Sequence, residues 1–424
     1  MKLLMLAPQP CYIDRGTPIA VDLTLATLSD AGHEVDLLTF PGGEDRHYKG
    51  LRTFRVTDRF SKTPARPGLS AYKLLLDVLM LGKAIKLAAT NRYTLVHAVE
   101  ESSFIALVLR IFFRIPYISD MDSRMTTQLT DRFRWLKPFD KLLWAIESLP
   151  IRFARGVVTM CDSLRDQVKL VRDDNVFVVK DVSLLDYYNS TDLHLPPELA
   201  EIRNRHKTLL MYIGNLEIYQ GIDLLLDAFA QLQRDKPDNE AGLVVVGGDT
   251  DRIAHYKQRA KELVIAERTY FMGHQPVGLL KALTEKTDLL VSPRTQGTNT
   301  PLKIYSYLDS GVPVLCTNLQ THTQVVNTEQ AKLCAATPAA MANAITELMS
   351  DPEQCASLAR NAKQLVNEQH SVAVFQRQLL RVYAELTGEP TGPCMQSETS
   401  ESALPTQVPL EDNHQQRKIN GAAR

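Results

Sequence analysis

The sequence predicts an α/β protein of two domains, each a doubly wound parallel sheet covered by helices. Short apolar runs alternate with longer helical patterns along most of the chain, which is typical of parallel α/β units. The length of 424 residues exceeds what one hydrophobic core normally organises. A polar stretch with two prolines, Leu184–Pro197, interrupts the alternation and predicts the connection between the domains.

Residues 1–188 carry the pattern of the first domain. Its predicted strands are Leu3–Ala7, Glu34–Thr39, Leu95–Ala98, Tyr117–Asp120, Gly156–Met160 and Val176–Val179. Helical patterns lie between them, including Pro18–Ala31, which Gly32 closes, and Ala71–Ala89.

Residues 189–370 repeat the alternation and form the second predicted domain. Its predicted strands are Leu209–Ile213, Gly242–Val246, Thr269–Phe271, Leu289–Ser292 and Val312–Cys316, with helices at Ile222–Gln233, Pro276–Thr284 and Pro301–Ser310. Two such Rossmann-like domains would face a central cleft at the carboxyl ends of their strands. Residues 389–424 lack aromatic residues and are rich in polar residues and proline, which predicts a disordered tail.

Composition restricts the partners. A formal net charge of −1 argues against nucleic acid as a ligand. The six cysteines are scattered singly, which predicts reduced thiols in a cytoplasmic protein and no zinc site. Pro8 and Pro10 end the first apolar run too early for a signal peptide. No run approaches the roughly 18 apolar residues of a membrane span, and Arg110 and Arg114 interrupt the most apolar stretch.

The most informative segment is Ser292–Thr317, in which a predicted strand leads into a polar loop and a helix. Thr300 is a good helix N-cap, Pro301 suits the first helical position, and Gly311 ends the helix. The loop itself contains Gly297.

Lys303 falls in the first turn of that helix, where the helix dipole disfavours a cation. A bound anion such as phosphate would remove the conflict, with Arg294 as a second cation. The alternative is a surface lysine tolerated at a small cost.

The first domain has a similar arrangement after its first strand. Arg15-Gly-Thr-Pro18 again offers a threonine N-cap, Thr17, followed by proline, and Gly16 would let a ligand approach the backbone. Many ordinary helices begin in this way.

These segments resemble family-4 glycosyltransferases of the GT-B fold, and the resemblance covers nearly all of residues 1–388. The matching stretches are Arg15–Pro18, Tyr93–Ala98 with Glu100, Tyr117–Ser123, Tyr212–Glu217 with Tyr219–Gly221, Tyr270–Gly273 and Ser292–Thr317. The last stretch, with Pro-Leu-Lys-Ile-Tyr-Ser-Tyr followed by Ser-Gly-Val-Pro-Val, is the most specific.

The resemblance implies transfer of a sugar from a nucleotide-sugar with retained anomeric configuration, without metal or cofactor. The second domain would bind the nucleotide: its base against Gly273–Gln275, its ribose near Ser306, and its diphosphate at Gly297–Thr300 and Lys303. The full donor-binding set is Gly16, Thr17, Gly214, Asn215, Gln220, Gly273, His274, Gly297, Thr298, Asn299, Thr300 and Ser306. The first domain would bind the acceptor, and a last helix, within residues 371–388, would pack back on it.

The catalytic residues implied are Asp122, Lys303 and Arg294, and the acceptor-side residues are Arg15, His97 and Glu100. Departures from the family pattern bear on these roles. Thr298 and Ser306 stand where many relatives have glutamates. Asn215 and Gln220 replace an arginine and a lysine, and Asp122 stands where a histidine is common. Donor binding would therefore depend strongly on Lys303 and Arg294.

Two patterns around the first domain's strand ends have other interpretations. Asp120 and Asp122 form an Asp-x-Asp pair, which could bind a metal or could be two polar residues at a strand end. His97 and Glu100 are a poor metal pair because residues three apart on a strand face opposite ways. His97 could line the cleft or be a structural histidine.

Basic residues interleaved with aromatics suit an anionic membrane surface. One group is Arg52, Arg55, Arg59, Lys62 and Arg66, against one acid, Asp58. Another is Arg124, Arg132, Arg134, Lys137, Lys141 and Arg152, with Trp135 and Trp144. Peripheral attachment to the inner face of a membrane follows as a hypothesis, the alternative being a solvated helix face.

The sequence therefore predicts a hexosyltransferase of glycan or glycolipid biosynthesis, with a carbohydrate, lipid-linked or small-molecule acceptor. The alternative from a different class is a catalytically silent sugar-nucleotide-binding or scaffold subunit. A GT-B epimerase is a further alternative, as is a phosphorylase, whose pyridoxal-phosphate lysine is not evident.

Overall fold

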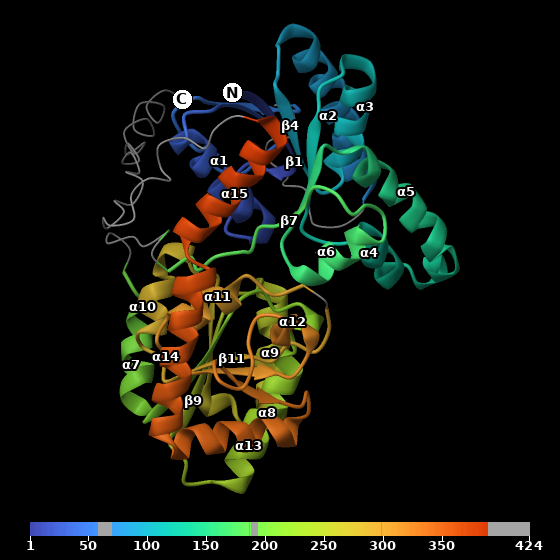
Figure 1. Cartoon of the computed structure of the whole chain (residues 1–424). Coiled ribbons are helices and arrows are strands. Elements are labelled where there is room, and N and C mark those ends of the chain that lie inside the picture. The colour runs from blue at the N-terminus through green and yellow to red at the C-terminus, as the bar shows by residue number, and fades with distance from the viewer. Residues whose placement is uncertain (58–69, 186, 188–193, 298, 389–424) are drawn as a thin grey trace, which may run out of the picture.

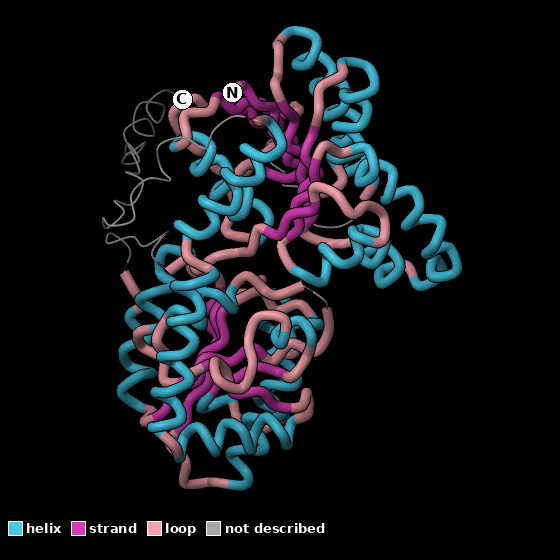
Figure 2. The backbone as a smooth tube through the Cα atoms, in the orientation of Figure 1, coloured by secondary structure: helices cyan, strands magenta, loops and turns pink. Residues whose placement is uncertain are grey.

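The computed structural model describes residues 1–57, 70–185, 187, 194–297 and 299–388. It has two lobes, each a parallel sheet enclosed by helices (Figures 1 and 2), and the predicted two-domain α/β fold is confirmed. The predicted tail, 389–424, lies outside the described residues.

The first sheet has seven described strands, all parallel. In spatial order they are β3 (Leu51–Arg55), β2 (Glu34–Phe40), β1 (Lys2–Pro10), β4 (Leu95–Val99), β5 (Tyr117–Met121), β6 (Gly156–Thr159) and β7 (Val176–Val178). Its helices are α1 (Gly16–Asp30), α2 (Ala71–Thr90), α3 (Ser102–Phe113), α4 (Met125–Arg132), the 3-10 helix η1 (Arg134–Phe139), α5 (Asp140–Phe153) and α6 (Asp162–Lys169).

The second sheet has six described strands in the same relative order. They are β10 (Thr269–Gly273), β9 (Ala241–Val246), β8 (Thr208–Ile213), β11 (Leu289–Ser292), β12 (Val314–Thr317) and β13 (Lys332–Cys334). The helices are α7 (Pro197–Arg205), α8 (Ile222–Asp235), α9 (Thr250–Glu262), α10 (Leu280–Thr284), α11 (Lys303–Asp309), α12 (Gln320–Thr323), α13 (Pro338–Ser350), α14 (Pro352–Gln369) and α15 (Val372–Thr387), with short 3-10 turns η2 (Ile218–Gln220), η3 (Ala266–Arg268) and η4 (Val277–Leu279).

The strand order fixes where ligands can bind. In each sheet the chain moves outward from the first strand in one direction and then returns to continue on its other side, between β1 and β4 and between β8 and β11. Ligands of such sheets bind outside the carboxyl ends of the strands at this switch point. The loops after β1, β4, β8 and β11 are therefore the positions to examine.

The last helix, α15, belongs to the core of the first lobe, although it follows the second in sequence. Phe375, Leu379 and Tyr383 are buried in one cluster with side chains of β1 and α1. Arg155, just before β6, donates a hydrogen bond to the carbonyl of Leu386. In Figure 1, α15 rises from the lower lobe and ends beside the upper sheet.

The same cluster joins the two lobes. It includes the buried side chain of Leu280 from α10, and Val277 and Leu302 pack against it. The Val277 N–H also donates to Asp14 Oδ2 over 3.2 Å.

Candidate functional site

Arg294 organises the loop that follows β11. Its Nη1 donates to the carbonyl of Asn299 over 2.7 Å and to Thr321 Oγ1 over 3.2 Å, and its Nε donates to the carbonyl of Gln296 over 2.9 Å. Gly297 has φ +113°, and a Cβ there would lie 2.7 Å from the Arg294 Nη2. The loop therefore wraps the guanidinium, which fits only glycine at position 297.

Lys303 is the first residue of α11, and its ammonium group makes two contacts. Its ammonium donates to Gln220 Oε1 over 3.1 Å and lies 3.7 Å from the centroid of the buried Tyr212 ring. Burial, with the nearby Arg294 guanidinium as a smaller cause, holds the pKa of Lys303 well below its usual value. A cation destabilised in this way would gain from an arriving anion.

The two predicted threonine caps are wrong. Helix α11 begins at Lys303, and the buried Thr300 hydroxyl accepts from Gln324 Nε2 over 2.8 Å instead. Helix α1 begins at Gly16, so Thr17 lies in its first turn and its hydroxyl bonds to Asp122. In both places a tertiary partner takes the hydroxyl that a cap would use.

The remaining predicted donor residues lie at the carboxyl edge of the second sheet. A Cβ at Gly214, after β8, would lie 3.0 Å from Lys303 Nζ, so this glycine keeps room beside the ammonium. Asn215 Oδ1 accepts from the N–H of Glu217 over 3.3 Å, which orders the same turn. Gly273 ends β10 with φ +66°, and His274 beyond it is exposed. Thr298 lies outside the described residues.

Ser306 is fully buried in α11. Its Oγ accepts from the Leu184 N–H over 2.9 Å, which ties the segment after β7 to the second lobe. The hydroxyl is therefore part of the junction, and its role toward a ribose stays a prediction.

The first lobe presents carboxyl groups at the facing edge. Asp122 follows β5, and burial, followed by repulsion from Asp120 and Glu100, raises its pKa well above the usual value. Burial and the neighbouring Glu101 raise the pKa of Glu100 to about 7, and burial and Asp120 raise that of Asp181 to about 7.

Glu100 has a conformation that supports a functional role. Its φ of +50° is in the left-handed region, which costs energy for a residue with a Cβ. Its carboxylate accepts from Ser123 Oγ over 3.4 Å. Glu100 therefore reaches the loop that follows β5.

His97 is hydrogen-bonded to a carboxyl group at this edge and to the last helix. It is buried, its Nδ1 lies 2.7 Å from the Tyr383 hydroxyl and its Nε2 lies 3.0 Å from Asp120 Oδ2. The tautomer with hydrogen on Nε2 satisfies both partners, because it donates to the carboxylate and accepts from the tyrosine. His97 thus connects β4, β5 and α15.

The two edges meet in one contact. Asn299 Nδ2 donates to the backbone carbonyl of Asp122 over 2.7 Å. Arg15 is exposed on the first-lobe side, within electrostatic range of Glu100 and Tyr219. The structure therefore brings together the loops that carry Lys303, Asn299, Asp122 and Glu100.

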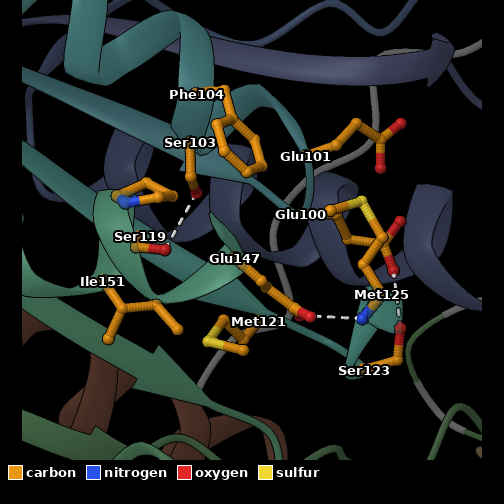
Figure 3. A pocket seen from close by; sticks show the side chains of 11 residues that line it. Glu100, Glu101, Ser103, Phe104, Ser119, Met121, Ser123, Met125, Glu147 and Ile151 are labelled. Carbon is orange, nitrogen blue, oxygen red and sulfur yellow. Dashed lines mark hydrogen bonds between the residues drawn. The ribbon is translucent and has the colours of Figure 1, made fainter. Parts of the chain in front are cut away.

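A pocket opens in the first lobe beside Glu100 (Figure 3). It lies between α3, the end of β5, the start of α4 and α5. Its lining residues are Glu100, Glu101, Ser103, Phe104, Ser119, Met121, Ser123, Met125, Glu147, Pro150 and Ile151. Glu147 accepts from the N–H groups of Met125 and Thr126, each over 2.8 Å, which fixes the wall formed by α4.

Sequence reasoning missed three supporting residues. Tyr212 lies under Lys303, Asp181 joins the carboxyl group, and Tyr383 bonds to His97. Tyr212 opens one of the stretches that resemble the family and lies at the end of an apolar strand, but neither signal indicates a contact with Lys303. Nothing local marks Asp181 or Tyr383, because their partners are distant in sequence.

Asp120 and Asp122 bond to different partners, His97 and Thr17, although the charge of Asp120 raises the pKa of Asp122. In the part of the chain that the structure describes, no three His, Cys, Asp or Glu side chains form an arrangement that could hold a metal ion. Five cysteines are free thiols, and Cys394 lies outside the described residues.

Of the first predicted basic group, the structure describes Arg52 and Arg55, and both pair with acids. Arg52 donates to both oxygens of Asp36, each over 2.7 Å, and Arg55 pairs with Asp45 at 2.8 Å. Both arginines belong to β3, which the sequence did not predict. Asp58, Arg59, Lys62 and Arg66 lie outside the described residues.

The second group is partly exposed. Arg124 pairs with Asp140 at 3.3 Å and stacks 4.4 Å from the Trp144 ring centroid, whereas Trp135 is 70% exposed. Nothing is described of the Arg132 side chain. Within the described residues, no helix combines the length and apolarity that crossing a bilayer requires.

Comparison with known proteins matches two family models to the two lobes. The model described as Glycosyltransferase Family 4 matches residues 16–180, and Glycosyl transferases group 1 matches residues 200–365. A curated relative, the glycogen synthase of Mycobacterium tuberculosis, is 22% identical over 383 residues, which is 86% of this chain and 90% of the relative.

Solved structures share the fold. The sucrose-phosphate synthase of Thermosynechococcus elongatus has a TM-score of 0.74 at 18% identity, covering 91% of this chain and 99% of that one. The Anabaena protein HepE, solved in complex with UDP-glucose, has a TM-score of 0.68 at 16% identity, covering 91% and 100%. The predicted GT-B architecture is thereby confirmed.

Proposed function

Because the chain belongs to the family-4 and group 1 glycosyltransferases, we propose that it transfers a hexosyl unit from a nucleotide-sugar to an acceptor in glycan or glycolipid biosynthesis. The reaction proceeds with retention and without a metal. The nucleotide lies against the second lobe and the acceptor against the first. Free thiols at the five described cysteines support a cytoplasmic location.

The observation that carries the proposal is the environment of the Lys303 ammonium group. Its ammonium is desolvated at the carboxyl edge of the second sheet, beside Gly214, and its pKa is well below the usual value. A diphosphate placed there would restore the charged form and gain a strong charge-assisted hydrogen bond. As the glycosyl–phosphate bond breaks, negative charge grows on the leaving diphosphate, and a preorganised cation stabilises it.

Arg294 acts mainly through the loop. Its guanidinium is already bonded to the carbonyls of Gln296 and Asn299 and to Thr321. We assign it the positioning of Gln296 and Asn299 in this loop, with its charge as a secondary contribution toward the diphosphate. The sequence predicts a catalytic role for Arg294, whereas we propose that it is mainly a positioning residue.

Asp122 and Glu100 act on the sugar side. Because the pKa of Asp122 is raised well above its usual value, its carboxyl group keeps its proton to a higher pH than an ordinary aspartate does. In that form it can donate a hydrogen bond to a sugar hydroxyl. Glu100, with a pKa of about 7, can exchange a proton with an acceptor hydroxyl near neutral pH. The pocket beside Glu100 is the acceptor position that we propose.

A panel of nucleotide-sugars tests the proposal by calorimetry, with product detection by mass spectrometry and EDTA in a parallel series. We expect binding of one donor, slow hydrolysis without acceptor, and no loss with EDTA. Binding without hydrolysis or transfer to any acceptor would instead favour a silent sugar-nucleotide-binding subunit. Absence of binding to every donor would contradict both.

A further inference from the structure

Three helices of the first lobe expose large apolar side chains on their outer faces. Helices α2, α3 and α5 pack side by side, α3 in the middle, and form the right-hand side of the upper lobe in Figure 1. The exposed apolar residues are Leu74, Leu75, Val78 and Ile85 on α2, Ile111 and Phe112 on α3, Trp135 and Phe139 on η1, and Leu142, Ile146, Leu149 and Phe153 on α5. We call this set the α2–α3–α5 surface.

On α5 the exposed side chains form one stripe. Leu142, Ile146, Leu149 and Phe153 fall within about 60° of the helix circumference, because they recur at three- and four-residue spacing. The opposite face, with Glu147 and Ile151, is buried in the lobe. Helix α5 therefore carries apolar side chains on both faces. The inner face is covered by the lobe, whereas the outer apolar stripe is exposed to solvent.

Helix α2 has the same arrangement. Leu74, Leu75, Val78 and Ile85 lie along its outer side, and Val78 is 66% exposed. Between α2 and α5, the end of α3 adds Phe112, which is 75% exposed. Apolar exposure on three adjacent elements is more than the scattered single residues of an ordinary surface.

The most exposed charged residues on these elements are all cations. The exposed charged residues of α2, α3 with its C-cap, η1 and α5 are Lys86, Arg110, Arg114, Arg134, Lys137, Lys141 and Arg152. The acids on these elements are Glu147, which is buried, Asp77, which is half-buried, and Asp140, which is part-exposed and pairs with Arg124. The surface therefore presents apolar stripes among cations.

We propose that the α2–α3–α5 surface docks on an anionic lipid bilayer, with the apolar stripes in the interface and the cations at the headgroups. A second copy of the chain is disfavoured as the occupant, because seven exposed cations would face seven. The exposed Trp135 fits the interfacial region, where its amphipathic ring is favoured. The proposal is independent of the catalytic function.

Vesicle co-sedimentation of the full chain tests it. The probes are vesicles of pure phosphatidylcholine and of phosphatidylcholine with one-third phosphatidylglycerol, at low and physiological salt. We expect binding to the anionic vesicles only, weakened by salt. Absence of binding to anionic vesicles, or equal binding to both, would overturn the proposal.

Variants locate the contact. The double substitution Ile146→Asp with Leu149→Asp should lower the partition coefficient at least about tenfold, because it removes two inserted side chains. The matched control is Val264→Asp in the second lobe, where Val264 is 89% exposed with φ +60°, a conformation that aspartate tolerates. Equal loss in variant and control would overturn the assignment.

The electrostatic part is tested separately. Lys141→Glu with Arg152→Glu should lower binding at least about tenfold at low salt, since each cation contributes roughly 1 kcal/mol. Arg360→Glu with Lys363→Glu, exposed on α14, changes the net charge equally and should leave binding unchanged. A wild-type dimer that Ile146→Asp with Leu149→Asp dissociates, without vesicle binding, would identify a self-interface and overturn the proposal.

Discussion

The facing edges of the two sheets both carry ionisable groups whose charged form is destabilised by burial. The groups are cations on one edge and carboxyl groups on the other. The second-lobe edge holds two partly buried cations, Lys303 and Arg294, and desolvation lowers the pKa of both. The first-lobe edge holds the carboxyl groups of Glu100, Asp122 and Asp181, and burial raises the pKa of each. One hydrogen bond, from the Asn299 side-chain amide to the Asp122 backbone carbonyl, joins the two edges.

The difference indicates which ligand group each edge is suited to bind. A desolvated cation gains from an anion, whereas a protonated carboxyl group gains from a neutral hydroxyl. A nucleotide-sugar has both groups, with the diphosphate at one end and the sugar hydroxyls at the other. On the proposed function, this asymmetry would therefore favour one orientation of the donor across the junction.

Removing the cation should have the largest effect. We expect Lys303→Ala to lower kcat/KM by about 100- to 1000-fold, because the growing charge of the leaving group loses a preorganised partner. Donor affinity measured by calorimetry should also fall, and Lys286→Ala, on the exposed surface of the same lobe, should change neither. Unchanged donor affinity in Lys303→Ala would exclude our diphosphate position.

Substituting the carboxyl edge should have a smaller effect, mainly on turnover. We expect Asp122→Ala to lower kcat about tenfold, whereas Asp122→Asn should retain most activity, because an amide replaces a protonated acid as a hydrogen-bond donor. Steady-state kinetics at neutral pH separates the two. If both variants lose activity equally, Asp122 acts as an anion, and if both match the wild type, it has no part in the reaction.

Ionisable groups on both edges should make donor affinity fall as the pH rises. Above pH 7 Glu100 becomes anionic, and Lys303 loses charge more readily than an ordinary lysine. Donor affinity should therefore fall several-fold between about pH 6 and pH 8 by calorimetry, as repulsion of the diphosphate grows. Glu100→Gln should flatten this dependence, and a steeper or reversed profile in that variant would contradict it.

Asp181 should affect stability rather than donor binding. Its pKa of about 7 in the folded chain lies above the unfolded value of roughly 4, so folding favours the proton and stability falls as pH rises between these values. Asp181→Asn should therefore have a higher free energy of unfolding than the wild type at pH 8, by up to about 4 kcal/mol, and show little difference at pH 4. Asp174→Asn, whose carboxylate pairs with Arg172, should show no such gain.

Strongly periodic elements were predictable from the sequence, and elements that depend on distant partners were not. The run Leu289–Ser292 predicts β11 at its observed bounds, because a buried strand must be apolar throughout. Strand β3 escapes prediction since its arginines suggest a solvated segment, although Arg52 pairs with Asp36 on the neighbouring strand. The short edge strand β13 has too few residues to show a pattern.

The site follows the same rule. Lys303 is recognisable from its conflict with the helix start, which is local information. The helix starts themselves were misplaced because the hydroxyls of Thr17 and Thr300 bond to Asp122 and Gln324, which only the folded chain brings near. The exposed stripes of α2 and α5 were missed because an apolar stripe in sequence does not reveal whether it faces inward or outward.

The return of α15 to the first lobe has a consequence for the order in which the protein folds during synthesis. The core that surrounds β1 and α1 needs Phe375, Leu379 and Tyr383, which leave the ribosome after nearly everything else. Domains usually fold in the order of synthesis. We therefore expect the core of the first lobe to stay incomplete until α15 has been synthesised, after the second lobe. A chain that stalls before residue 375 should then be more accessible to chaperones and proteases in its amino-terminal half than the complete protein.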